Sequence, residues 1–198
     1  MKLSGIMKPS HGKQPKPQRR KAPRMRRLVL LRHAEAASAP LGDFSAEADM
    51  NRPLTPAGQE VARRCGHWLA AQRIVPDSII CSPALRTRQT LAGALTALPP
   101  ALPTPNYCAD IYEATPEALL ARIQQVPDSA FTVLMVGHNP GISLLAHHLD
   151  MQASELDQGF APGAVAIFEM YGSDTLPDMT HWQMCDGQSM HLHTFARP

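Results

Sequence analysis

The feature that most constrains the fold is a run of four aliphatic residues, Leu28 to Leu31, that ends abruptly in Arg32 and His33. A short aliphatic run of this kind is typical of a strand buried on both faces of a parallel sheet. Open α/β folds bind their ligands outside the carboxyl ends of the strands, so this strand would bring a guanidinium and an imidazole to the ligand-binding edge. The pair alone is weak evidence, because a lone histidine at a strand end more often serves the structure.

Strands and helices alternate along the rest of the chain. The aliphatic runs and helical spacings predict strands at 78–81, 107–112, 131–136 and 163–170, and helices at 56–72, from 83, from 116 and after 141. Three of these helices follow a Ser-Pro or Thr-Pro pair. The Ser or Thr suits the N-cap and the proline suits the first helical position, so the predicted N-caps are Thr55, Ser82 and Thr115. An antiparallel edge strand is predicted at 180–185, after a turn at 172–177. The order predicts an α/β protein with three layers, α/β/α, around a mostly parallel sheet.

Composition divides the 198 residues into a tail and one domain. The first 27 residues hold ten of the 19 Lys and Arg residues and no Asp or Glu, with four prolines. We therefore expect residues 1–26 to be a disordered basic tail and residues 27–198 to form the domain. The tail is interpreted as a solvated extension, or as the product of a start codon placed too early, in preference to a patch that binds nucleic acid or an anionic surface.

Other features indicate the class of protein. No run approaches the roughly 18 apolar residues that a membrane helix requires. The four cysteines are scattered, without the spacing of a zinc site or a disulfide framework, and are expected to be reduced thiols in a cytoplasmic protein. Paired histidines at 147–148 and at 191 and 193 are interpreted as surface residues, so no metal and no cofactor is expected.

Polar side chains follow four of the predicted strands: Arg32 with His33, then Arg86, Glu113 and His138. The carboxyl ends of parallel strands share one edge of a sheet, so we expect these groups to converge there. Arg88 is excluded because it lies two residues, roughly 200°, further around the helix than Arg86. Two guanidinium and two imidazole groups at one edge predict a site for an anion, and a phosphoryl group suits arginine's paired N–H groups.

A neutral histidine is also a nucleophile. We expect His33 to attack phosphorus in line and water to hydrolyse the phosphohistidine that forms. Arg32, Arg86 and His138 would hold the oxygens and stabilise the transition state. Glu113 is the candidate general acid for an alkoxide leaving group.

Four motifs of the chain resemble those of a known family. They are Leu31-Arg-His-Ala-Glu35, Leu54-Thr-Pro-Ala-Gly58, Ser82-Pro-Ala-Leu-Arg-Thr-Arg-Gln-Thr90 and Val136-Gly-His-Asn-Pro140. In this order they resemble the histidine phosphatase superfamily, the phosphoglycerate mutase-like group, and within it the SixA-type phosphohistidine phosphatases, over about residues 27 to 185. The resemblance implies the same fold, no metal, His33 as nucleophile, and a phosphate pocket of Arg32, Arg86 and His138, with Asn139 of the last motif as a further substrate contact.

Two positions depart from the family pattern. Ala34 replaces the common glycine of the first motif, and its methyl group is expected to be tolerated in a tighter turn. Glu113 is interpreted either as the acid that many phosphomonoesterases of the superfamily carry or as a surface carboxylate, since the phosphohistidine branch can lack the acid.

The lengths of the connections between the predicted elements indicate the substrate class. The stretch from His33 to Pro56 is short, so no long lid is expected and the site is predicted to be shallow and open. Such a site suits a phosphohistidine on a folded protein, whose labile P–N bond needs little help from an acid. The alternatives are a phosphatase of small phosphomonoesters and, from another class, a phosphate-binding interaction module without catalysis.

Overall fold

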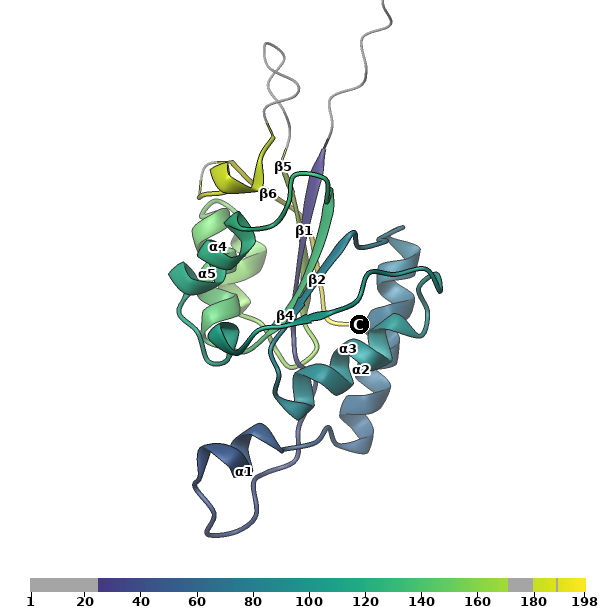
Figure 1. The fold of residues 1–198 in the computed structure, drawn as a ribbon, viewed down its shortest axis with the longest axis vertical. Coiled ribbons are helices and arrows are strands. Elements are labelled where there is room, and N and C mark those ends of the chain that lie inside the picture. Colours follow the sequence, from purple (N-terminus) through teal and green to yellow (C-terminus); the bar gives the residue numbers. More distant parts are fainter. Residues whose placement is uncertain (1–24, 171–179, 188) are drawn as a thin grey trace, which may run out of the picture.

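The computed structural model describes residues 25–170, 180–187 and 189–198. Within these ranges the sheet has six strands in the order β3-β2-β4-β1-β5-β6 (Figure 1). The strands are β1 (Arg26–Arg32), β2 (Ser78–Cys81), β3 (Asn106–Tyr107), β4 (Thr132–Gly137), β5 (Val165–Met170) and β6 (His191–Ala196). Strands β1 to β4 are parallel, whereas β5 is antiparallel to β1 and β6 is antiparallel to β5. The prediction of a mostly parallel sheet is confirmed.

Helices cover both faces of this sheet (Figure 1). The α-helices are α1 (Ala46–Met50), α2 (Pro56–Ala71), α3 (Leu85–Leu95), α4 (Pro116–Gln124) and α5 (Gly141–Leu149). Alternate residues of β1 divide the core: Leu28 and Leu30 pack with residues of α4 and α5, while Val29 and Leu31 pack with residues of α2 and α3. The structure therefore has the predicted three layers.

Local sequence explains where two of the helices begin. The hydroxyl of Thr55 accepts a hydrogen bond from the N–H of Gly58, and Thr115 does the same for Ala118, each followed by proline in the first turn. The prediction that Ser82 caps the next helix is wrong. Helix α3 begins two residues after Pro83, at Leu85, without a side-chain cap. The Ser82 hydroxyl instead contacts His138, as described below.

Two predicted strands differ from the structure. The strand expected at 107–112 is limited to β3, because a 3₁₀ helix, η1 (Ala109–Ile111), follows it. The edge strand expected at 180–185 is wrong: this segment contains η3 (Trp182–Met184), and β6 pairs with β5 instead. The reason is the buried Trp182, whose indole N–H donates a 2.7 Å hydrogen bond to the carbonyl of Ala130. The turn predicted at 172–177 lies outside the described residues.

The first strand begins at Arg26, one residue before the predicted domain boundary. The Arg26 side chain is buried, where it donates to the carbonyls of Thr180 and Ala130 and lies over the ring of Trp182. These contacts hold the start of β1 in the domain. Disorder of the tail stays a prediction, because residues 1–24 lie outside the described part of the chain. The 3₁₀ helix η2 (Ser154–Gln158) lies between α5 and β5.

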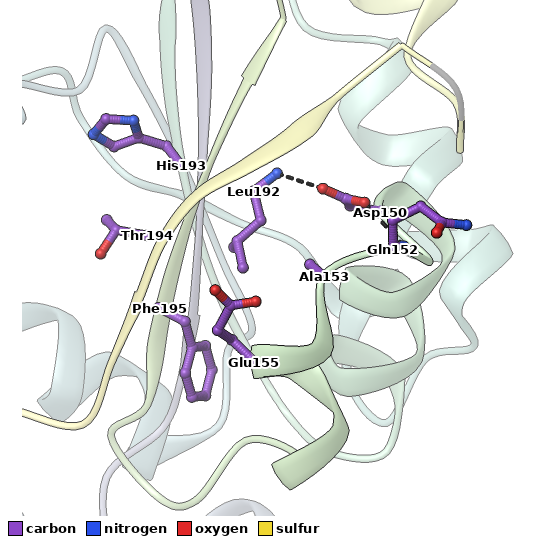
Figure 2. A pocket seen from close by; sticks show the side chains of 8 residues that line it. All are labelled: Asp150, Gln152, Ala153, Glu155, Leu192, His193, Thr194 and Phe195. Atoms are coloured by element: carbon purple, nitrogen blue, oxygen red, sulfur yellow. Dashed lines mark hydrogen bonds between the residues drawn. The ribbon is translucent and has the colours of Figure 1, made fainter.

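A groove with a volume of about 370 Å³ lies beside the edge strand β6 (Figure 2). Asp150 and Glu155 line it on one side, and Leu192 and Phe195 line it on the other. The Asp150 carboxylate accepts a hydrogen bond of 2.9 Å from the Leu192 N–H, which joins the end of α5 to β6. The groove shares no residue with the polar cluster at the carboxyl edge of the sheet. No helix among the described residues is both long and apolar enough to cross a membrane.

Candidate active site

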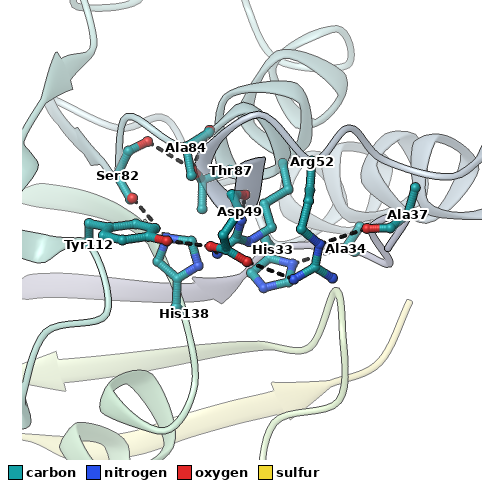
Figure 3. A network of polar contacts seen from close by, with 11 residues as sticks. His33, Ala34, Ala37, Asp49, Arg52, Ser82, Ala84, Thr87, Tyr112 and His138 are labelled. Carbon is teal, nitrogen blue, oxygen red and sulfur yellow. Dashed lines mark hydrogen bonds and ion pairs between the residues drawn. The ribbon is translucent and has the colours of Figure 1, made fainter. Parts of the chain in front are cut away.

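Three neighbouring parallel strands end at the same level and carry the central residues of the site. Arg32 of β1 is paired with Gly137 of β4, so His33 and His138 follow side by side. Ser82 follows β2, whose last residue is paired with the neighbour of Gly137. The rings of His33 and His138 have centroids 5.2 Å apart, at an interplanar angle of 57°. The sheet thus brings together the two histidines that the sequence predicted to converge (Figure 3).

The hydrogen bond of His33 defines which ring nitrogen is free. Nδ1 lies 2.8 Å from the carbonyl oxygen of Ala34. Because a carbonyl oxygen only accepts, Nδ1 carries the proton, and Nε2 of the neutral ring keeps its lone pair. Nε2 is therefore the nitrogen available for nucleophilic attack.

The turn after His33 is held by the start of α2. A Cβ atom added to Gly58 would lie 2.0 Å from the carbonyl oxygen of Glu35, so only glycine permits this approach. The N–H of Thr55 donates a 3.0 Å hydrogen bond to the same oxygen. The methyl group of Ala34 is fully buried with Leu54, and the Ala34 N–H donates to the Thr90 hydroxyl. The Ala34 methyl group therefore has a packing partner, which agrees with the expectation that alanine is tolerated here.

The buried ring of His138 contacts two side chains from other segments of the chain. Its Nε2 atom lies 2.8 Å from the hydroxyl oxygen of Ser82, and the ring of Tyr112 meets the imidazole edge-on at 5.3 Å. Its Nδ1 atom is buried and has no hydrogen-bond partner among the described residues. A buried nitrogen without a partner is costly, so this atom marks a position where the site can bind a polar group.

One guanidinium nitrogen of Arg32 is hydrogen-bonded to the protein, and another has no partner among the described residues. One terminal nitrogen donates a 2.6 Å hydrogen bond to the carbonyl of Phe160. Its Nε atom is buried and lacks a partner within the described ranges. Asn139, which was predicted to contact substrate, uses its amide for protein contacts: it donates to the same Phe160 carbonyl at 2.9 Å and accepts from Ser143. Asn139 therefore positions the carbonyl that holds Arg32.

Arg86 is buried at the start of α3 and contacts a residue that the sequence analysis did not single out. Its two terminal nitrogens donate to the backbone carbonyl of Asp49 at 2.6 Å and to the Asp49 carboxylate at 2.9 Å. The hydroxyl of Tyr112 also donates to this carboxylate, and Arg52 forms a 2.9 Å ion pair with it (Figure 3). Arg88, in contrast, lies over the ring of Tyr107.

Asp49 lies on α1, within the short stretch between His33 and Pro56 for which the sequence predicted neither a helix nor a strand. The signal that marks this helix is Ser45, whose hydroxyl caps it by accepting from the Ala48 N–H. The connection is short and contains the helix α1, which brings a carboxylate to Arg86. The sequence signal for Tyr112 is limited to its position next to Glu113, the candidate general acid.

Glu113 lies one residue beyond Tyr112. Its backbone has φ of 48°, in the left-handed region, and its side chain is exposed. Among the described residues it forms no hydrogen bond and no ion pair. The structure therefore places Glu113 near the cluster without joining it to the two histidines.

Burial and charge keep both imidazoles neutral. Burial lowers the pKa of His33 to about 4, and the positive charges of Arg86 and Arg32 add to the effect. Burial, Arg86 and His33 lower the pKa of His138 to about 3. Burial alone would raise the pKa of Asp49, but the hydrogen bonds from Tyr112, Arg52 and Arg86 outweigh it and hold this pKa well below its usual range. At neutral pH the site therefore combines neutral imidazoles, guanidinium ions and one carboxylate.

This arrangement can bind an anion with tetrahedral oxygens next to a neutral nucleophile. Arginine Nε always donates, and a neutral imidazole donates through Nδ1 when the other nitrogen accepts. Within the ranges that the structure describes, no three His, Cys, Asp or Glu side chains lie together as metal ligands.

Comparison with known proteins supports this chemistry. Residues 28–107 match the family model of the histidine phosphatase superfamily (branch 1). An uncharacterized protein of Mycobacterium tuberculosis is 34% identical over 152 residues, which are 77% of this chain and 89% of that protein. The phosphohistidine phosphatase SixA of Escherichia coli is 27% identical over 165 residues, covering 79% of this chain and 92% of SixA.

A solved structure shows the same fold. The putative phosphohistidine phosphatase SixA from Nakamurella multipartitia superposes with a TM-score of 0.72 and 29% identity, covering 90% of this chain and 99% of that chain. Fold, sequence relatives and family model agree on a phosphatase. The chain belongs to the histidine phosphatase superfamily.

Proposed function

We propose that this phosphatase hydrolyses phosphohistidine on proteins through a covalent intermediate on Nε2 of His33. The observation that carries the proposal is the pair of buried, unpartnered nitrogens, Arg32 Nε and His138 Nδ1, beside the free Nε2 of His33. Two donors and one nucleophile on side chains that cluster at one edge of the sheet suit a phosphoryl group, whose oxygens accept hydrogen bonds while its phosphorus is attacked.

The reaction has two displacements. In the first, the lone pair of His33 Nε2 forms a bond to phosphorus, and the bond to the leaving group breaks with its electron pair on that group. In the second, water forms a bond to the phosphorus of the phosphorylated His33 and the P–N bond breaks with its electron pair on Nε2. The products are the neutral imidazole and inorganic phosphate, which carries both protons of the water. Arg32, Arg86 and His138 stabilise the phosphoryl oxygens in both steps.

Substrate class follows from the leaving group. When the other ring nitrogen of a phosphohistidine carries a proton, the imidazole leaves as a neutral molecule and needs no acid. The exposed Glu113, without hydrogen bonds among the described residues, suits such a substrate. The name of the E. coli relative, phosphohistidine phosphatase, points the same way.

The second candidate substrate is a small phosphomonoester. The observation in its favour is Glu113 itself, a carboxyl group one residue beyond Tyr112, whose ring contacts His138. An alkoxide leaving group is strongly basic and requires a proton from an acid in this position.

Rapid quenching with substrate that carries labelled phosphorus tests the intermediate. We expect acid-labile label on the wild-type protein and none on His33→Ala, with His191→Ala as a control that exchanges an exposed histidine outside the site. Absence of label from the wild type during turnover would contradict the mechanism. Hydrolysis that continues in His33→Ala would also contradict it, and binding of phosphate without any hydrolysis would identify a non-catalytic binding module.

A substrate panel separates the two classes. Wild type and Glu113→Gln are assayed on a phosphohistidine protein, on sugar phosphates and on p-nitrophenyl phosphate. We expect the phosphohistidine protein to be the best substrate and its rate to be unchanged by Glu113→Gln. A preference for sugar phosphates that Glu113→Gln abolishes would show that the phosphomonoester alternative is correct.

The cellular setting is also a proposal. The four cysteines are free and buried thiols, which supports a reducing compartment such as the cytoplasm. The partner is then a cytoplasmic protein that carries phosphohistidine. A nucleic-acid role would depend on the basic tail alone, and deleting residues 1–24 without loss of activity would limit the tail to an appendage.

A further inference from the structure

The guanidinium of Arg86, which is expected to bind the phosphoryl group, is hydrogen-bonded to another residue of the protein. Arg86 is 3% exposed, and both of its terminal nitrogens donate to Asp49, one to the backbone carbonyl at 2.6 Å and one to the carboxylate at 2.9 Å. A buried guanidinium requires such acceptors, because an unpaired buried charge is costly. Asp49 therefore supplies the negative charge that a phosphoryl group would supply during the reaction.

The Asp49 carboxylate is bound as a ligand would be. Three side chains from different elements donate to it: Arg86 of α3, Tyr112 after η1 and Arg52 after α1. Figure 3 shows this carboxylate between the ring of Tyr112 and the guanidinium of Arg52, close to His33 and His138. Carboxylate and phosphoryl oxygens offer arginine the same kind of charged acceptor, so the two groups compete for Arg86.

The helix that carries Asp49 has little else to hold it. Helix α1 contains five residues, none of which is buried. The segment before it exposes Leu41 and Phe44 almost completely, at 106% and 97%. Because the helix buries no apolar side chain, moving it away from Arg86 loses ion pairs and hydrogen bonds but almost no hydrophobic contact.

We propose that Asp49 is an internal competitor for the Arg86 subsite, carried by α1 as a strap that must release Arg86 when a phosphoryl group binds. The inference rests on the proposed function only in taking Arg86 as part of the phosphate pocket. At neutral pH the carboxylate is ionised, since its pKa is held low by Tyr112, Arg52 and Arg86 against the effect of burial. An anion must then bind strongly enough to displace the Asp49 carboxylate from Arg86.

Binding of inorganic phosphate, measured by calorimetry, tests the competition without any turnover. Asp49→Asn keeps the shape of the side chain and removes its charge, so we expect phosphate to bind about five- to tenfold more tightly, the range of a partly buried ion pair. Glu47→Gln removes the same charge from the same helix at an exposed position and should leave the affinity unchanged. Unchanged or weaker binding in Asp49→Asn, or equal tightening in Glu47→Gln, would overturn the inference.

Hydrogen exchange in the wild-type protein tests the movement of the strap and needs no variant. We expect saturating phosphate to accelerate exchange of the backbone amides of 48–52, because Asp49 loses its bonds to Arg86 and Tyr112. Slower or unchanged exchange in this segment would show that Asp49 keeps its place when the anion binds.

Arg86→Gln separates this inference from the proposed function. If Arg86→Gln stays folded in thermal unfolding and binds phosphate as well as the wild type, Arg86 is not part of the phosphate pocket, so the competition fails while the proposed function still stands on Arg32, His33 and His138. If Arg86→Gln weakens phosphate binding but Asp49→Asn does not strengthen it, only the competition fails. If Arg86→Gln does not fold, the calorimetric comparison of Asp49→Asn with Glu47→Gln still tests whether Asp49 competes with phosphate.

Discussion

The imidazole rings of His33 and His138 lie 5.2 Å apart at the ends of two adjacent parallel strands, and each ring has one nitrogen bonded to the protein and one available to a ligand. For His33 the available atom is Nε2, a nucleophile, and for His138 it is Nδ1. The proposed roles of the two residues therefore differ, although their rings lie side by side.

The first expectation concerns the titration of these histidines. Because burial and nearby arginines lower the pKa of His33 to about 4, its ring should stay neutral, and its NMR signals unchanged, from neutral pH down to about pH 5. Arg52→Gln removes one of the positive charges and should shift the titration upward. A wild-type titration midpoint near 6.5 would contradict the burial that the structure shows.

The same shifts make stability depend on pH. The pKa values of both histidines, about 4 and about 3, lie below the 6.5 of the unfolded chain. Between 6.5 and these values the unfolded state binds more protons, so the free energy of unfolding should be highest above pH 6.5 and fall as the pH drops toward 3. Thermal unfolding at a series of pH values measures the fall, and His138→Gln should make it smaller.

Arg32→Lys tests the unpartnered Nε atom. Lysine keeps the positive charge but cannot bond the Phe160 carbonyl and present a second donor at the same time. We expect kcat/KM to fall roughly 10- to 100-fold, the loss of about one charged hydrogen bond, with little change in stability. Arg27→Lys, which alters an arginine at the other end of β1 that is paired with Glu169, is the matched control and should retain full activity.

Ser82→Ala tests the support of His138. The substitution removes the hydroxyl that lies 2.8 Å from Nε2 and leaves a buried nitrogen without its partner. We expect the free energy of unfolding to fall by about 1–3 kcal/mol and kcat to fall about tenfold, because the ring loses the contact that orients it. Ser154→Ala, at an exposed position, should change neither quantity. Full activity in Ser82→Ala would show that packing alone orients His138.

Gly58→Ala tests the turn that follows His33. A Cβ atom would lie 2.0 Å from the carbonyl oxygen of Glu35, so the start of α2 and the turn must separate. We expect a loss of about 1–3 kcal/mol in chemical denaturation and a lower kcat, since the Ala34 carbonyl that binds His33 moves with the turn. Gln59→Ala, the exposed neighbour, should have little effect on either measurement.

The sequence alone is sufficient to predict the layered α/β architecture and the convergence of Arg32, His33, Arg86 and His138. Aliphatic runs and helical spacing are local signals, and parallel strands must end at a common edge, so residues that follow them meet without further information. Helical geometry likewise separates Arg86 from Arg88, which lies on another side of the helix.

Other parts of the site and of the fold depend on contacts that local sequence does not encode. Asp49, Arg52 and Tyr112 join the cluster through contacts between distant segments, and the stretch that carries Asp49 has no periodicity to reveal it. The partner of Ser82 and the choice of β6 as the edge strand depend on which residues packing brings into reach, as the buried Trp182 shows. The neutrality of the two histidines comes from burial, which is a property of the folded chain and not of any local motif.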